Sequence, residues 1–207
     1  NLINGNAAKA AFRFNTNKNN TVQMKVALSA TSIEDAYKNM TAELPDWNFE
    51  KTVANAKFAW NKALAVIDAE GTTEQKQIFY TGLYRNFIQP NNLANADGTY
   101  SGTDFTTHKA TDGTHYSTFS LWDTYRATHP LYTLTAPQKD AAFINSMLRQ
   151  YKTYGYLPIW QLWGDENYCM IGNHAIPVIA DAMLKGIKGF DYEEAYKACV
   201  ASSTTDH

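Results

Sequence analysis

The sequence predicts a mainly α-helical protein that begins with two β-strands, and three observations support this fold class. Apolar and polar residues alternate around Phe12 and Phe14 and again over 22–28, which is typical of half-buried strands. From Thr31 onward, apolar residues recur every three or four positions, as they do on one face of a helix. A polar stretch at 91–115 is rich in Asn, Asp, Gly and Thr, and a loop of this length usually carries function. We therefore expect the end of a sheet followed by helix hairpins.

Capping residues and helix breakers set the expected helix boundaries. Helices are predicted over seven stretches, at 31–40, 49–67, 72–90, 117–129, 136–154, 174–188 and from 191 onward. Four residue pairs have the three-residue spacing of an N-terminal cap: Thr31 with Glu34, Thr72 with Gln75, Thr135 with Gln138, and Asp191 with Glu194. Gly71 and Gly155 are expected to end the helices before them, because glycine adopts the left-handed conformation that closes a helix.

Composition excludes several classes of protein. The chain has 207 residues, of which 44% are hydrophobic, enough for a core in one large or two small domains. A formal net charge of -2 leaves no basic surface for nucleic acid. No apolar run approaches the roughly 20 residues that cross a bilayer, so no membrane span is expected. Asn1 begins in polar sequence without a signal-peptide pattern, so we expect that processing or truncation removed what preceded it. Cys169 and Cys199 are expected to be free thiols and do not decide the compartment.

Glu166 is the first candidate for chemistry. In the sequence, Trp160 and Trp163 precede it and Tyr168 follows it. A carboxyl group among aromatic rings is poorly solvated, which raises its pKa and suits it to protonate a leaving oxygen. From spacing alone, a helix-capping or surface glutamate is the commoner role for such a residue.

A second cluster surrounds Trp122 and Asp123. Trp122 offers an aromatic face on which a sugar ring stacks, and Asp123 accepts hydrogen bonds from hydroxyl groups. The plainer interpretation is an ion pair between Asp123 and Arg126, three residues apart on a helix. His174 follows Gly172 at a predicted helix start, where a capping or core histidine is the more frequent role.

Three segments resemble glycoside hydrolase family 92, and they occur in the order of the family. The segments are FYTGLYR at 79–85, YSTFSLWDTYR at 116–126 and LPIWQLWGDENYCMIGNHAIPVIADA at 157–182. The likeness extends from about Val22 to the end of the chain.

The resemblance implies a bacterial, exo-acting α-mannosidase with an N-terminal β-sandwich and a C-terminal (α/α)6 barrel. The expected fold is then mainly α: the first half of an (α/α)6 barrel, preceded by the last strands of the sandwich and a helical linker. Residues 1–30 would be the remnant of the sandwich, 31–71 the linker and 72–207 the N-terminal part of the catalytic domain.

The resemblance also implies a mechanism and site residues. Such enzymes invert the anomeric configuration and use a calcium ion that binds O2 and O3 of mannose. Glu166 falls where the family carries its catalytic acid, Trp122 and Asp123 match residues that hold the terminal mannose, and His174 falls in the same sugar-binding surface. The implied partners are mannose-containing glycans, and the implied location is secreted, periplasmic or outer-surface associated.

Two departures limit this interpretation. The family commonly has Asn-Glu-Thr-Asn-Cys where this chain has Asp-Glu-Asn-Tyr-Cys at 165–169, which puts the leaving-group specificity in doubt. Nothing after Asp191 resembles the Asp-rich, Gly-rich motif of the general base, so the base and several calcium ligands are expected beyond His207. A non-catalytic carbohydrate-binding protein, or another (α/α)6 glycosidase of the trehalase or glucoamylase kind, stays open as an alternative.

Overall fold

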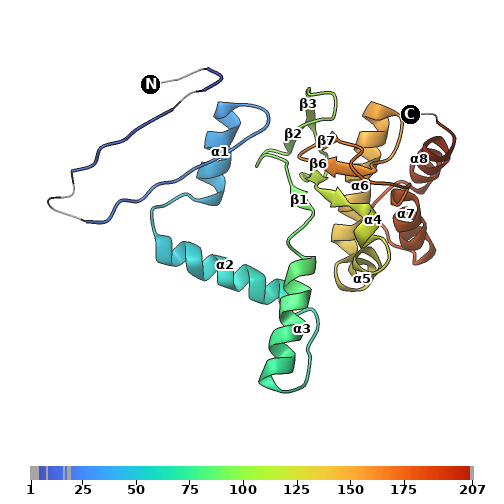
Figure 1. Cartoon of the computed structure of the whole chain (residues 1–207), viewed down its shortest axis with the longest axis horizontal. Helices are drawn as coiled ribbons and strands as arrows, with labels where there is room; N and C mark the ends of the chain where they lie inside the picture. Colours follow the sequence, from blue (N-terminus) through green and yellow to red (C-terminus); the bar gives the residue numbers. More distant parts are fainter. Residues whose placement is uncertain (1–4, 8, 16, 18–19, 206–207) are drawn as a thin grey trace.

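The computed structural model describes residues 5–7, 9–15, 17 and 20–205. In this part of the chain, helices account for roughly half of the residues, and short strands form three small sheets (Figure 1). The helices are α1 (Ile33–Glu43), α2 (Phe49–Leu64), α3 (Thr73–Asn86), α4 (Leu121–Thr124), α5 (Thr128–Thr135), α6 (Pro137–Tyr154), α7 (Ala175–Leu184) and α8 (Tyr192–Thr204). The strands are β1 (Asn91–Asn92), β2 (Thr99–Ser101), β3 (Thr107–Lys109), β4 (Tyr116–Ser117), β5 (Phe119–Ser120), β6 (Trp160–Leu162) and β7 (Asp165–Glu166). The fold is therefore mixed rather than mainly helical.

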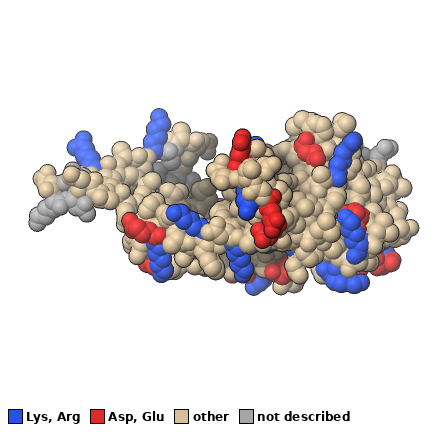
Figure 2. Space-filling view, turned by 90° about the horizontal axis from the view of Figure 1, so that it is seen from below, with Lys and Arg blue, Asp and Glu red and all other residues tan. Residues whose placement is uncertain are grey.

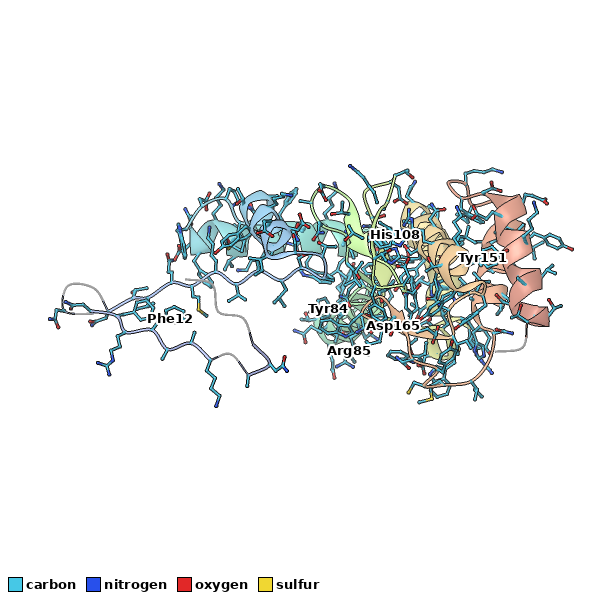
Figure 3. All side chains as sticks on the ribbon, turned by 90° about the horizontal axis from the view of Figure 1, so that it is seen from above. Phe12, Tyr84, Arg85, His108, Tyr151 and Asp165 are labelled. Carbon is cyan, nitrogen blue, oxygen red and sulfur yellow. The ribbon has the colours of Figure 1, made fainter. Side chains whose placement is uncertain are left out.

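The N-terminal segment does not form the predicted half-buried strands. Its described residues before α1 carry no strand, and side chains expected to be half-buried are exposed, with Phe12 at 74% and Leu28 at 80%. In Figure 1, the described residues of this segment run as an extended chain outside the helical part of the molecule. Figure 3 places Phe12 on this chain, away from Asp165. A strand needs a neighbour to satisfy its backbone, and no described segment pairs with this one. The sandwich origin of residues 1–30 stays a prediction, and part of the connector between the two expected strands lies outside the described residues.

Capping explains where the first helices begin. α1 begins one residue later than predicted, because Ser32 rather than Thr31 accepts the hydrogen bond from the Asp35 backbone, at 3.0 Å. The capping box of Thr72 and Gln75 is confirmed in full at the start of α3. α2 ends at Leu64, well before Gly71. α1 and α2 bury none of their residues, so their apolar stripes lie on the surface.

The core lies between the later helices. α6 packs against α5, α7 and α8, and its buried face includes Ile144 and Met147, both 0% exposed. Gly155 ends α6 in the left-handed conformation at φ +84°, as predicted. The start of α6 differs from the prediction: Ala136 is the N-cap, and the hydroxyl of Thr135 donates to the Leu131 carbonyl within α5 instead. Asp191 caps α8 as predicted, accepting from the backbones of the two glutamates that follow Tyr192.

Short strands replace two features that were predicted differently. The predicted helix near 117–129 is divided into β4, β5, α4 and α5, because Ser117 pairs with Asn91 and Phe119 pairs with Gln161. Thr118, between these two strands, has a left-handed backbone at φ +69°, which no helix tolerates. The polar stretch 91–115 contains the β2–β3 hairpin, as well as β1.

Candidate functional site

The three-stranded sheet β5–β6–β7 places Glu166 inside the protein. Gln161 pairs with Phe119 on one side and with Glu166 on the other. Because directly paired residues project from the same face of a sheet, these three side chains share one face. That face is buried: Phe119 is 2% exposed, Gln161 1% and Glu166 6%. Leu162, paired with Asp165, belongs to the opposite, partly exposed face.

The carboxylate of Glu166 closes the open end of the β6–β7 hairpin. Its oxygens accept five N–H hydrogen bonds, four of them from backbone groups: Ile159 N at 2.7 Å, Trp160 N at 2.9 Å, Asn167 N at 3.1 Å, Tyr168 N at 3.1 Å, and the Gln150 side-chain amide at 3.2 Å. Backbone amides of this kind form a cradle for an anion. The groups bonded to the Glu166 carboxylate are thus N–H donors, which its spacing from aromatic residues in the sequence did not predict. Its role as proton donor stays a prediction.

Trp122 and Asp123 lie on α4, immediately after β5. Trp122 is 38% exposed, and Asp123 is exposed and accepts a hydrogen bond from the Ser120 hydroxyl. No ion pair joins Asp123 to Arg126 in the described part of the chain; Arg126 donates instead to the Tyr125 hydroxyl at 2.7 Å. Asp123 therefore keeps acceptor capacity for an external hydroxyl group.

His174 lies at the N-cap position of α7 and contacts the residue that ends α4. Its ring contacts that of Tyr125, with centroids 4.4 Å apart. Gly172 makes this position possible: its φ is +91°, and a Cβ there would lie 2.3 Å from Cε1 of His174. Tyr125 therefore brings His174 to the C-terminal end of the α4 turn that carries Trp122 and Asp123. The structure thus links His174 through Tyr125 to the turn of α4 that carries Trp122 and Asp123.

Asp165 and three tyrosines form a further group that the sequence analysis did not assign. The Tyr154 hydroxyl donates to Asp165 Oδ1 at 2.8 Å; burial, and then this hydrogen bond, raise the pKa of Tyr154 to about 12. The ring of Tyr156 stacks on Tyr154 at 5.5 Å and contacts Tyr168 at 6.2 Å. A signal was present in the sequence: neighbours in a strand project to opposite faces, so an inward Glu166 requires an outward Asp165.

Left-handed backbone conformations gather around this sheet. Four described non-glycine residues have positive φ, and three of them are Thr118, Trp163 and Tyr168. Such conformations cost about 1–2 kcal/mol for most side chains and cluster at functional sites. Trp163 lies at the opposite end of the hairpin from the Glu166 cradle and is 73% exposed. Trp163 lines a groove of about 420 Å³ that lies between residues 26–30, α1 and residues 92–95.

Two negative findings hold for the described residues. Across 5–7, 9–15, 17 and 20–205, no three His, Cys, Asp or Glu side chains come together as metal ligands. These residues therefore do not form a carboxylate-rich calcium site by themselves, and the expected calcium ion stays a prediction. Within the same residues, no helix has the length and apolar character needed to cross a membrane.

Comparison with known proteins decides the family. The family model for the Glycosyl hydrolase family 92 catalytic domain matches residues 35–207, most of the chain. The chain belongs to glycosyl hydrolase family 92.

Family 92 members of known structure share its fold. An α-mannosidase of Bacteroides thetaiotaomicron, solved alone and with mannoimidazole, is 39% identical and superposes with TM-scores of 0.83 and 0.82. The structure without ligand aligns over 86% of this chain and 24% of the bacterial protein. An inverting mannosidase of the same organism is 31% identical, with a TM-score of 0.80 over 86% of this chain and 25% of the other.

A curated relative supports the assignment to the glycosidases. It is an uncharacterized secreted glycosidase of Arthroderma benhamiae, 26% identical over 201 residues, which cover 94% of this chain and 22% of the relative. The chain thus spans about a quarter of the length of these similar proteins.

Proposed function

We propose that the protein carrying this chain is a secreted glycosidase that releases terminal α-linked mannose from glycans. The observation that carries the proposal is the ring contact of His174 with Tyr125, which ends the α4 turn that holds Trp122 and Asp123, in a chain of family 92. An exposed indole face, a carboxylate with free acceptor capacity and an imidazole suit the apolar face and the hydroxyl groups of a sugar ring. Mannose is the proposed sugar because the similar solved structures are mannosidases, one of them with mannoimidazole bound.

The proposed reaction is hydrolysis with inversion at the anomeric carbon. A general acid protonates the departing oxygen while a general base takes a proton from the attacking water, so the C1–O bond breaks as a new one forms on the opposite face. Calcium is proposed as a requirement of the whole protein. Glu166 is the proposed acid, and the hydrogen bonds of its cradle would open for its carboxyl group to reach a substrate.

The test is mannose release by the gene product that contains this chain. We expect hydrolysis of α-mannosides but not α-glucosides, loss of activity in EDTA and recovery with calcium. Asp123→Ala should lower kcat/KM by about 10- to 100-fold, because it removes a hydrogen bond to a charged group. The surface carboxylate Asp46, which pairs with Lys51, provides a control: Asp46→Ala should leave the rate unchanged.

Three results would contradict the proposal. Cleavage of α-glucosides that survives EDTA would favour a trehalase-like or glucoamylase-like enzyme. Mannose binding without hydrolysis would favour a carbohydrate-binding protein. Full activity of the Asp123→Ala variant would remove Asp123 from the sugar site.

A further inference from the structure

Gln150 is a buried amide of α6 that contacts the Glu166 carboxylate. It is 2% exposed, and its Nε2 donates to Glu166 Oε2 at 3.2 Å. Its other polar atom, Oε1, is buried and has no hydrogen-bond partner among the described residues. Buried polar atoms almost always have partners, so Oε1 of Gln150 is an acceptor for which this state of the site supplies no donor.

The two oxygens of the Glu166 carboxylate are not equivalent. Oε1 accepts from three backbone amides, whereas Oε2 accepts from Ile159 N at 2.7 Å and from the Gln150 side chain. A backbone N–H only donates, but the end of a glutamine carries a donor and an acceptor. Of the five described partners, Gln150 is therefore the one that can also accept a proton held on Glu166.

We propose that Gln150 is a positioning residue that stabilises the protonated form of Glu166. This rests on the proposed function, in which Glu166 is the general acid. A half-turn of the amide about its Cγ–Cδ bond exchanges Nε2 and Oε1, so that Oε1 accepts a hydrogen bond from a proton on Glu166 Oε2. When this proton passes to the departing sugar oxygen, the amide turns back and Nε2 donates to the resulting carboxylate. Each protonation state of Glu166 thereby has a partner in Gln150.

The titratable groups beside this contact are paired with other residues. The Tyr154 hydroxyl donates to Asp165 Oδ1 at 2.8 Å. Burial, and then this hydrogen bond, raise the pKa of Tyr154 to about 12, so Tyr154 is neutral over the pH range of the test. The charged neighbours of Gln150 on α6 form ion pairs elsewhere: Arg149 with Asp112 at 2.6 Å, and Lys152 with Glu194 at 2.8 Å.

The test compares two substrates that differ in their need for a proton. α-Mannobiose releases a sugar whose oxygen must be protonated as it departs, whereas dinitrophenyl α-mannoside releases a phenolate that leaves without a proton. Gln150→Met in the gene product keeps the length of the side chain and removes both polar atoms. We expect kcat/KM for α-mannobiose to fall about 3- to 10-fold, the effect of one lost hydrogen bond, and the rate on dinitrophenyl α-mannoside to stay the same.

The pH profile of α-mannobiose hydrolysis gives a second measure. In Gln150→Met, the four backbone N–H donors that remain around Glu166 favour its carboxylate over its protonated form. The alkaline limb of the kcat/KM profile should therefore move to lower pH by about half to one unit.

Gln161→Met is the matched control. Gln161 pairs with Glu166 across the strands and is as deeply buried as Gln150, at 1% exposed, but neither polar atom of its side chain has a hydrogen-bond partner among the described residues. The substitution should change neither rate and leave the alkaline limb in place. The proposal is overturned if Gln150→Met lowers both rates equally, as a purely structural role would, if it lowers neither, or if Gln161→Met shows the same selectivity.

Failure of the proposed function gives a different result. If the unsubstituted protein hydrolyses neither substrate, that function fails, and infrared difference spectra between alkaline and acid pH decide about Gln150. The C=O band of protonated Glu166 is identified by its absence from Glu166→Gln. It must move to higher frequency in Gln150→Met, where the hydrogen bond from the proton is lost, and must not move in Gln161→Met. An unmoved band, or no band at all, overturns the proposal.

Discussion

His115 is a buried histidine whose surroundings set its charge. It is 2% exposed, and its ring stacks on Tyr100 with centroids 3.8 Å apart. No described group forms a hydrogen bond with either ring nitrogen. Burial, with the positive charge of Arg149 as a smaller cause, lowers the pKa of His115 from 6.5 to about 3. The structure thus makes His115 a neutral core residue.

This pKa predicts a stability loss in acid. Between pH 6.5 and about 3, the unfolded chain binds a proton at His115 that the folded chain does not, so the free energy of unfolding falls as pH falls. At pH 4.5 the loss from His115 should be about 2–3 kcal/mol. Urea denaturation at pH 7 and 4.5 measures it. His115→Phe preserves the ring stack on Tyr100 and should lose less stability by that amount; equal losses in both proteins would show that His115 is not the cause.

At the scale of elements, the β6–β7 hairpin is too short to be stable alone. It has three residues in one strand and two in the other, and its end is closed by the Glu166 carboxylate. The hairpin aligns β5, and thereby the α4 turn with Trp122 and Asp123. Glu166 thus supports the candidate sugar site through the backbone whatever its part in the chemistry.

Glu166→Gln separates a structural role from proton donation. The amide end of glutamine donates where the cradle needs an acceptor, so buried N–H groups lose partners. We expect the free energy of unfolding in urea to fall by about 2–4 kcal/mol. Glu194→Gln, which weakens only the partly exposed pair with Lys152, should cost less than about 1 kcal/mol. If Glu166→Gln kept full stability but lost activity on poor leaving groups alone, proton donation would be the better account.

The whole molecule has two unequal parts. The residues from β4 to α8 pack around one core, whereas α1 and α2 bury none of their side chains. Trp60 of α2 contacts Tyr84 of α3 at 4.5 Å, but neighbouring apolar side chains are exposed, including Phe58 at 71% and Ile78 at 69%. On the face shown in Figure 2, basic and acidic side chains are interspersed.

These apolar faces predict that residues 1–207 by themselves self-associate. Exposed apolar patches of this kind drive association in water. Sedimentation velocity over a range of concentrations should show oligomers. Replacing Phe49, Phe58 and Ile78 with lysine should weaken association by more than about tenfold, because each buried aromatic or aliphatic side chain contributes about 1.5–3 kcal/mol.

The control for this prediction lies on the same helices. Alanine at the exposed polar positions Glu50, Lys57 and Glu74 should leave association unchanged. A monomeric wild-type polypeptide at high concentration would show that the exposed faces do not drive association.

Local chemistry in the sequence determined much of this protein. Periodicity placed α2, α3, α6 and α8, and the caps at Thr72 and Asp191 and the stop at Gly155 are confirmed, because these signals act over three or four residues. The three ordered motifs determined the family.

Only the tertiary structure decided the direction and environment of side chains. The residues 22–28, predicted as a strand, pair with no described strand. The helix predicted near 117–129 is interrupted because β5 pairs with β6. In the sequence, Glu166 lies near aromatic residues, but in the structure its carboxylate accepts hydrogen bonds from five N–H donors. The reason is that its pairing with Gln161 directs the Glu166 side chain inward and leaves Asp165 on the outer face. Strand register joins residues distant in the chain, so the sequence alone does not reveal which face a side chain occupies.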